Sequence, residues 1–343
     1  MRILIIGGTG LISTAITRDL LTRGEDVWMY NRGQTSTYSI PPEGAHVVAG
    51  DRQRYTAFEQ QIADLGRFDC VIDMICYLPQ DAESAVRAFS SRTDQYMFCS
   101  TVDVYRKPAT RYPYAEDEPY GGLNAYSTNK VRCEQILRRA HEYGDLPVTI
   151  IRPGYTYGEG RSPANTWGLG SAYIDRLRKG KPVVVHGDGS SFWTACHRDD
   201  VGAAFANAAG NARTVGRAYH VPGETWMTWN DYHRIVAEAI GAAEPTLVHI
   251  PTDVLGAVAP ERARISVENF QFSNIFDTSS ARKDLDFADR VRWREGVRRM
   301  VRWLDDHDGI QNSDLDPFED RLVDAWRRLG SDLFEAADSL GRV

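Results

Sequence analysis

The chain opens with a short apolar run that leads through closely spaced glycines into a helical pattern. Ile3 to Ile6 is β-branched and aliphatic, as in a strand buried on both faces of a parallel sheet. Apolar side chains then recur at helical spacing over residues 11–22. Glycines between strand and helix let a pyrophosphate approach the amides at the helix N-terminus. The opening therefore predicts a dinucleotide-binding fold, with cofactor contacts at Gly7, Gly8, Thr9, Gly10, Leu11 and Ile12.

Ser13 stands where a further glycine would complete the usual pattern. A serine adds only a hydroxymethyl group. We therefore expect Ser13 either to preserve the packing of helix on strand with a slight displacement, or to cap a backbone amide.

The second predicted strand, residues 26–30, ends in Asn31 and Arg32. An acidic residue at this place would accept hydrogen bonds from the adenosine ribose of NAD. Asn31 replaces it here, and the guanidinium of Arg32 can face a 2′-phosphate, so NADP is favoured over NAD. The alternative is that Arg32 stacks on adenine or faces solvent. Asp51 and Arg52, after the next strand, are expected near adenine.

Strand and helix patterns alternate along the first half of the chain, which predicts an α/β doubly wound parallel Rossmann sheet. The expected dinucleotide domain is 1–153 plus parts of 187–222. A smaller, mixed substrate lobe is expected from 154–186 and 223–310. Residues 311–343 are expected to form a C-terminal helical extension that packs on the domain or on a subunit partner.

Composition limits the class of protein. The 343 residues carry a net charge of −7, which does not favour nucleic acid as a partner. There is no metal-ligand spacing among the five cysteines, so we expect reduced core thiols and no metal site. The sequence has neither a signal-peptide pattern nor a membrane-length apolar run, so a cytoplasmic location is the default expectation.

Tyr126 and Lys130 lie four residues apart at the start of a predicted helix, and therefore on one helical face. An ammonium beside a phenol favours phenolate and moves the pKa of the tyrosine towards neutrality. Such a tyrosine can take a proton from an alcohol or give one to a carbonyl oxygen. The pair follows a strand that ends in Ser100 and Thr101, within the same dinucleotide fold.

Several segments in order resemble the extended short-chain dehydrogenase/reductase superfamily, specifically its NAD-dependent epimerase/dehydratase group. They are GGTGLIS, STVDVY, YSTNK, IRPGYTYG, GDGSSFWTACHRDDV, FDTSSARKDLDF and WREGVRRMVRWL, which together span roughly residues 1–305. The resemblance implies Tyr126 as acid/base, Lys130 on the nicotinamide ribose, and Thr101 on the reacting oxygen. It also implies cofactor contacts at Ser100 and Pro153, and homodimers are common in the group.

Asp103 lies where dehydratases and decarboxylases of this group often carry glutamate, so it is a candidate acid/base on carbon. The alternative is a solvated loop aspartate. Asp73 is interpreted as a loop hydrogen-bonder. The chain departs from sugar-nucleotide enzymes at Tyr155, where asparagine is usual, and at Trp193, where a phosphate-binding arginine is common.

The residues expected to bind substrate are Cys76, Tyr77, Tyr155 and Trp193. Tyr155 and Trp193 would stack on a ring, unless they are core or lobe-interface residues.

The reaction that the resemblance implies is epimerisation of a sugar, nucleotide-linked as is usual in this group, through transient oxidation of an alcohol. Alternatives are a sugar-nucleotide dehydratase, an NADPH-dependent ketone reductase, and a non-catalytic RNA-binding or cofactor-binding relative. A membrane partner is not expected.

Overall fold

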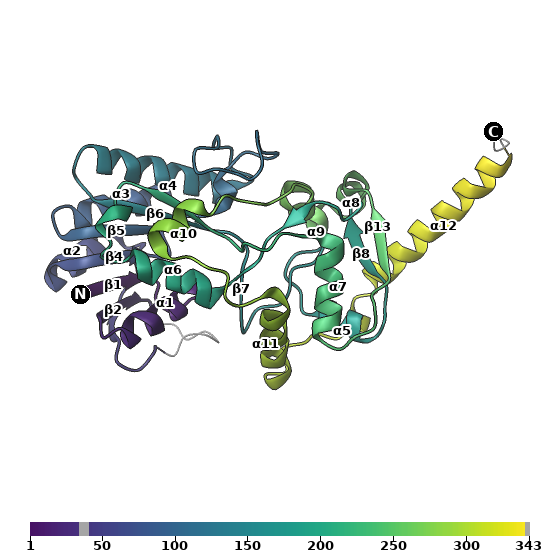
Figure 1. Cartoon of the computed structure of the whole chain (residues 1–343), viewed down its shortest axis with the longest axis horizontal. Coiled ribbons are helices and arrows are strands. Elements are labelled where there is room, and N and C mark those ends of the chain that lie inside the picture. The colour runs from purple at the N-terminus through teal and green to yellow at the C-terminus, as the bar shows by residue number, and fades with distance from the viewer. Residues whose placement is uncertain (34–40, 340–343) are drawn as a thin grey trace. The chain divides into compact units, whose positions relative to one another are not determined.

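A computed structural model describes residues 1–33 and 41–339 of the chain (Figure 1). Their contacts divide the chain into two compact units. The first unit contains residues 1–158, 194–226 and 275–293; the second contains residues 159–193, 227–274 and 294–343. Residues 275–293 therefore belong to the first unit, whereas the sequence placed them in the second lobe. Residues 340–343 of the predicted extension lie outside the described residues.

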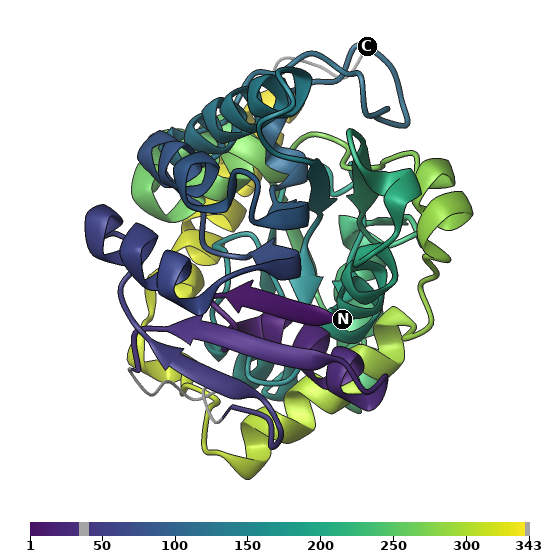
Figure 2. The same cartoon turned by 90° about the vertical axis from the view of Figure 1, so that its left-hand side faces the viewer.

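The first unit is built on a seven-stranded sheet in the order β11-β6-β5-β4-β1-β2-β3, and every pairing in it is parallel. Figure 2 looks onto these strands and the helices that flank them. The strands are β1 (Arg2–Ile6), β2 (Asp26–Asn31), β3 (His46–Ala49), β4 (Phe68–Asp73), β5 (Thr93–Cys99), β6 (Val148–Pro153) and β11 (Ala218–Val221). This confirms the predicted α/β Rossmann class.

Alternation along β1 divides the core into two layers. Ile3 and Ile5 face one apolar cluster, whereas Leu4 and Ile6 face the other. The first cluster is covered by α1 (Leu11–Thr22), α6 (Arg198–Ala208) and α10 (Ser279–Leu285). The second is covered by α2 (Tyr55–Leu65), α3 (Pro79–Phe89) and α4 (Ala125–Glu142). Helices on both faces of a parallel sheet leave its strand ends open to ligands.

Short elements complete the first unit. They are η1 (Val102–Val104), β7 (Thr156–Tyr157), β10 (Cys196–His197) and η2 (Ala212–Thr214). All five cysteines are buried free thiols, as the sequence predicted. Three of them, Cys70, Cys99 and Cys196, lie in the first core cluster.

The second unit contains two short sheets and most of the later helices. Its strands are β8 (Val183–His186), β9 (Phe192–Trp193), β12 (Met227–Thr228) and β13 (Leu247–Ile250). Its helices include α5 (Ala172–Arg178), α7 (Trp229–Ala239), α8 (Thr252–Val258), α9 (Pro260–Ile265), η3 (Ser266–Phe270), η4 (Ser313–Leu315) and α12 (Phe318–Ser339). Helix α11 (Trp293–Asp306) begins at the last residue of the first unit. Among the described residues, none of the helices combines the length and the apolar character that a membrane crossing needs.

Candidate active site

A cavity of about 460 Å³ opens at the carboxyl ends of β1 and β2 in the first unit. This is the edge at which doubly wound sheets bind ligands. The lining includes five of the predicted cofactor residues that come from the glycine turn and the end of β2, together with the two after β3. These seven residues are Gly7, Thr9, Gly10, Asn31, Arg32, Asp51 and Arg52.

The glycine turn has no room for side chains. Gly7 has a φ of +83°, and a Cβ there would lie 2.5 Å from Cγ2 of Ile75. A Cβ on Gly8 would lie 2.7 Å from Cε of Met29. The bare backbone therefore forms a cradle at the mouth of α1, where Leu11 and Ile12 occupy the first turn. First-turn amides lack intrahelical acceptors and suit a phosphate, so these residues fit a dinucleotide.

Ser13 caps the amide of Gly10. Its Oγ accepts a hydrogen bond from that nitrogen over 2.7 Å. Of the two roles considered for Ser13, the structure shows the capping role. The hydroxyl thus fixes the last glycine of the turn against the first turn of α1.

The two arginines at this cavity differ in their exposure and in the partners of their guanidinium groups. Arg32 is exposed at the rim, at the end of β2. Arg52 is buried, and its guanidinium pairs with Asp73 and donates to the carbonyl of Asp81 over 2.7 Å. Arg52 therefore contributes to the cavity wall while its charge is held inside the core. The sequence could not show which way this side chain turns.

Asp73 forms part of that buried network, and one of its oxygens holds the loop after β4. Its Oδ1 accepts from the amide of Ile75 over 3.1 Å, and its Oδ2 accepts from the hydroxyl of Tyr96 over 2.6 Å. This agrees with its interpretation as a loop hydrogen-bonder.

The predicted acid/base residues come from two neighbouring segments. Thr101 follows β5 and caps η1, since its Oγ1 accepts from the amide of Asp103 over 3.2 Å. Tyr126 and Lys130 lie in the first two turns of α4. A hydrogen bond joins the side chains of Thr101 and Tyr126. Two residues that are 25 positions apart in the sequence therefore meet through their side-chain hydroxyls.

Lys130 is almost entirely buried, and its ammonium is anchored to the end of β5. Its Nζ donates to the carbonyl of Cys99 over 2.6 Å. The same atom lies 4.8 Å from the ring centres of Tyr77 and Phe98, and 5.8 Å from that of Tyr126. A cation so close to aromatic faces is stabilised by their quadrupoles. Tyr77 also lines the cavity, so it joins the dinucleotide side of the site to the acid/base side.

The pKa of Tyr126 is raised, which differs from the expected movement towards neutrality. Desolvation of the phenol is the main cause, and Cys99, Tyr77 and Asp103 act in the same direction. The hydrogen bond with Thr101 opposes them. Tyr126 as a whole residue is 45 % exposed, so solvent limits the effect of desolvation. Lys130 is not among the groups that shift this pKa; its Nζ donates to the carbonyl of Cys99 and lies 5.8 Å from the centre of the Tyr126 ring.

Asp103 is half-buried beside this group and pairs with Lys107, whose Nζ lies 3.7 Å from its Oδ1. Burial lowers the pKa of Lys107 to about 8, while the charge of Asp103 opposes that change. The carboxylate of Asp103 therefore has a buried cationic partner that the sequence did not predict.

A buried network that the sequence did not predict supports these residues. Arg152 and Glu134 form a two-point ion pair, and the hydroxyl of Ser100 donates to Glu134 over 2.5 Å. Tyr120 donates to the same carboxylate over 2.6 Å. Ser100 thus contributes to the framework through its side chain. Arg152 is the one charged residue of β6, and this was the signal that the sequence offered.

The four predicted substrate residues separate into different environments. Tyr77 is 44 % exposed and Tyr155 is partly buried, with its ring 6.3 Å from that of Tyr157. Cys76 is fully buried in the core beneath the sheet, so its side chain does not face the cavity. Trp193 is 5 % exposed and packs on Trp229 in the second unit, which makes it a core residue.

Pro153 ends β6 and pairs in register with Val221 of β11, so it lies at the carboxyl edge of the sheet.

A buried cluster that the sequence did not predict consists of Cys196, Asp200 and Asp289, whose potential metal-ligand atoms lie within 4.8 Å of one another. Asp200 accepts from the amide of Val291 over 2.9 Å. This buried contact fastens the segment before α11 to the first turn of α6.

Comparison with known proteins gives a consistent result. The profile of the NAD dependent epimerase/dehydratase family matches residues 3–222. A 2'-dehydrokanamycin reductase of Streptomyces kanamyceticus is 27 % identical over 277 residues, which cover 81 % of this chain and 77 % of the relative. A chloroplast stem-loop binding protein of Arabidopsis thaliana is 27 % identical over 260 residues, which cover 72 % of this chain and 65 % of the relative.

Solved structures share the fold. A dTDP-glucose 4,6-dehydratase of Streptomyces venezuelae aligns with a TM-score of 0.71 at 18 % identity, covering 90 % of this chain and 98 % of that one. A UDP-glucuronic acid 4-epimerase of Bacillus cereus aligns with a TM-score of 0.68 at 16 % identity, covering 90 % and 99 %.

Proposed function

The chain belongs to the NAD dependent epimerase/dehydratase family, and from this premise we propose that it is an NAD(P)-dependent enzyme that transfers hydride at a secondary alcohol or ketone of a sugar-like substrate. The meeting of Thr101, Tyr126 and Lys130 beside the glycine-lined cavity carries this proposal. Epimerisation of a sugar, including a nucleotide-linked sugar, is the first reaction to test.

Different residues in and beside the cavity would hold different parts of the cofactor. The amides of Leu11 and Ile12, in the first turn of α1, would bind its pyrophosphate, and Asp51 in the cavity lining would contact its adenine. Arg32, exposed at the rim, is available to a 2′-phosphate, which supports NADP. A bound nicotinamide would supply the hydride donor or acceptor.

Tyr126 moves the proton of the reacting hydroxyl. Thr101 hydrogen-bonds Tyr126 and keeps the phenolic oxygen in place, so the two hydroxyls can share the substrate oxygen. Lys130 donates a hydrogen bond to the carbonyl of Cys99, which holds its ammonium beside the rings of Tyr77 and Phe98. In this arrangement Lys130 would contact the ribose of a bound cofactor and stabilise the charge that develops on Tyr126.

Asp103 distinguishes two types of reaction, because chemistry at a carbon next to the reacting alcohol needs a further acid or base. Its charge is among those that raise the pKa of Tyr126, and a bridging water would carry its action to a neighbouring carbon. Its carboxylate is held beside the buried ammonium of Lys107, 3.7 Å away. A simple alcohol–ketone conversion does not require it.

Net reduction of a ketone is the second candidate. The raised pKa of Tyr126 keeps the phenol protonated, which is the form that donates to a carbonyl oxygen. The core position of Trp193 also removes one of the expected ring-stacking residues. The relative named a 2'-dehydrokanamycin reductase supports a sugar ketone without a nucleotide.

The deciding experiment incubates the purified protein in deuterated water with two panels of candidate substrates and analyses the products. One contains nucleotide sugars with oxidised cofactor, and the other contains sugar ketones with reduced cofactor. An epimer without cofactor consumption supports epimerisation, whereas stoichiometric oxidation of NAD(P)H supports reduction. Carbon-bound solvent deuterium that disappears in Asp103→Asn assigns carbon chemistry to Asp103.

The control for a non-catalytic role uses the same preparation. If neither panel reacts, and the protein retains an RNA stem-loop at physiological salt, the enzymatic proposal is wrong. The net charge of −7 argues for the opposite result.

A further inference from the structure

The C-terminal helix α12 has two halves with different surroundings. In its first half, Val323 is buried in an apolar cluster with Val184, Val248 and Ile250, and Trp326 packs against that cluster. Beyond Trp326 the side chains lose this cover. Figure 1 shows the later turns of α12 continuing past β8 and β13, the strands beside its first half.

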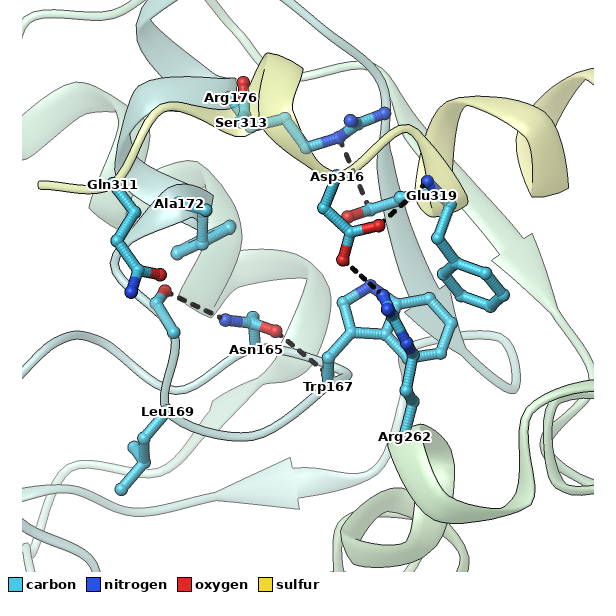
Figure 3. Close-up of a pocket in the computed structure, with 13 residues that line it drawn as sticks. Asn165, Trp167, Leu169, Ala172, Arg176, Arg262, Gln311, Ser313, Asp316 and Glu319 are labelled. Atoms are coloured by element: carbon cyan, nitrogen blue, oxygen red, sulfur yellow. Dashed lines mark hydrogen bonds and ion pairs between the residues drawn. The ribbon is translucent and has the colours of Figure 1, made fainter.

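The start of α12 is fastened to its own unit by charge. Arg176 pairs with Asp320 over 2.6 Å, and Arg262 pairs with Asp316 over 2.6 Å. Glu319 accepts from the amide of Val184 over 2.8 Å. Figure 3 shows Arg176 and Arg262 converging on Glu319 and Asp316 at a cavity of about 280 Å³. This anchored first half supplies the nucleus from which the exposed half continues as helix.

The exposed half carries a stripe of large apolar side chains. The stripe consists of Leu329, Leu333 and Phe334, which are 57 %, 68 % and 67 % exposed. Leu329 and Leu333 extend the spacing of Leu322 and Trp326 in alternating steps of four and three residues. That spacing is the seam of a coiled coil, so the face that packs on the unit continues beyond it.

Charges on the exposed half are divided along its length. Arg327 and Arg328 lie at its beginning, and neither guanidinium has an ion-pair partner in the described part of the chain. Asp332, Glu335 and Asp338 lie towards its end. Two positive and three negative charges give this segment a net charge of −1. An acidic end is unlike the basic polar face of helices that lie on anionic membranes.

We propose that the exposed half of α12 is an interface with a second copy of this chain, in which the two α12 helices pair antiparallel through Leu329, Leu333 and Phe334. Antiparallel pairing brings Arg327 and Arg328 of one copy to the acidic end of the other, twice by symmetry. Parallel pairing would place like charges together. This inference does not depend on the proposed reaction.

The expected contact is modest in size. Thirteen residues, 327–339, span about 20 Å of helix. Two short helices bury less than the roughly 1,200–2,000 Å² of a standard interface. We therefore expect reversible association in the micromolar range, and not a permanent dimer.

Sedimentation equilibrium of the full-length chain tests the stripe. Wild type should self-associate, and Leu333→Glu should weaken that step at least tenfold. Leu315→Glu is the matched control, because Leu315 is 82 % exposed in η4, outside the stripe, and should leave association unchanged. Circular dichroism checks that both variants are folded. A monomeric wild type at high micromolar concentration, or a Leu333→Glu protein that associates normally, would overturn the proposal.

Charge exchange tests the orientation. Arg327→Glu with Arg328→Glu should weaken association, and so should Asp332→Lys with Glu335→Lys. All four substitutions in one chain should restore it, because each basic end again meets an acidic end. No weakening in either double variant, no restoration in the quadruple variant, or vesicle binding without self-association contradicts the antiparallel pair.

Discussion

Arg152 of β6 and Glu134 of α4 form a fully buried, two-point ion pair, with Nε–Oε1 and Nη2–Oε2 distances of 2.8 and 2.6 Å. Burial acts to raise the pKa of Glu134, but Arg152 and the surrounding hydrogen bonds hold it below its usual range. The pair lies one helical turn from Lys130 and touches Ser100, next to Thr101. It therefore fixes the strand end and the helix that carry the acid/base residues.

Removing one partner of this pair should be costly. Glu134→Ala leaves the Arg152 guanidinium buried without its carboxylate, so we expect a loss of about 3–5 kcal/mol in the free energy of unfolding. Urea denaturation measures it. Asp117→Ala is the control, because Asp117 pairs with Arg111 on the surface and should cost at most about 1 kcal/mol. Equal losses in the two variants would remove the framework role.

The glycine turn can be tested with two glycines of similar backbone conformation. Gly7→Ala and Gly24→Ala both strain a positive φ, at +83° and +78°. Only at Gly7 does the new Cβ collide, with Ile75 at the cavity. We expect Gly7→Ala to weaken dinucleotide binding by about tenfold or more, or about 1.4 kcal/mol. Calorimetric titration should show wild-type affinity for Gly24→Ala.

Arg32 should decide between the two dinucleotides. A hydrogen bond to a charged group contributes about 1.5–3 kcal/mol, so Arg32→Ala should weaken NADP binding by about 10- to 100-fold. NAD binding should change little, because NAD lacks the 2′-phosphate. Titrating both cofactors into both proteins measures the ratio. Equal loss for the two cofactors would show that Arg32 does not read the phosphate.

His220 makes the stability of the protein depend on pH. Burial lowers its pKa from 6.5 to about 3, and Arg152 acts in the same direction. The unfolded chain therefore binds more protons between these values, and stability is lost as pH falls below 6.5. His220→Gln should reduce this slope by about 1.4 kcal/mol per pH unit. Urea denaturation across that range, with an unchanged slope in the variant, would exclude His220 as a source.

Most strands of the central sheet, and the helices α1 and α4, were predictable from local sequence patterns. Tyr126 and Lys130 could be paired because four residues separate them on one helix. Arg152 and Glu134 could not, because their contact depends on how β6 packs against α4. Cys76 and Arg52 follow strands at the ligand edge, yet their side chains turn into the core. Position along a strand predicts where a residue lies, but not which way its side chain points.

We propose that Tyr126 transfers the proton that accompanies hydride transfer. Single-turnover absorbance of the bound nicotinamide, with whichever substrate the panels identify, tests it most directly. We expect Tyr126→Phe to slow the hydride step about 10²–10⁴-fold while the dissociation constant of the cofactor stays at its wild-type value. A Tyr126→Phe protein that reacts within twofold of wild type would contradict the account.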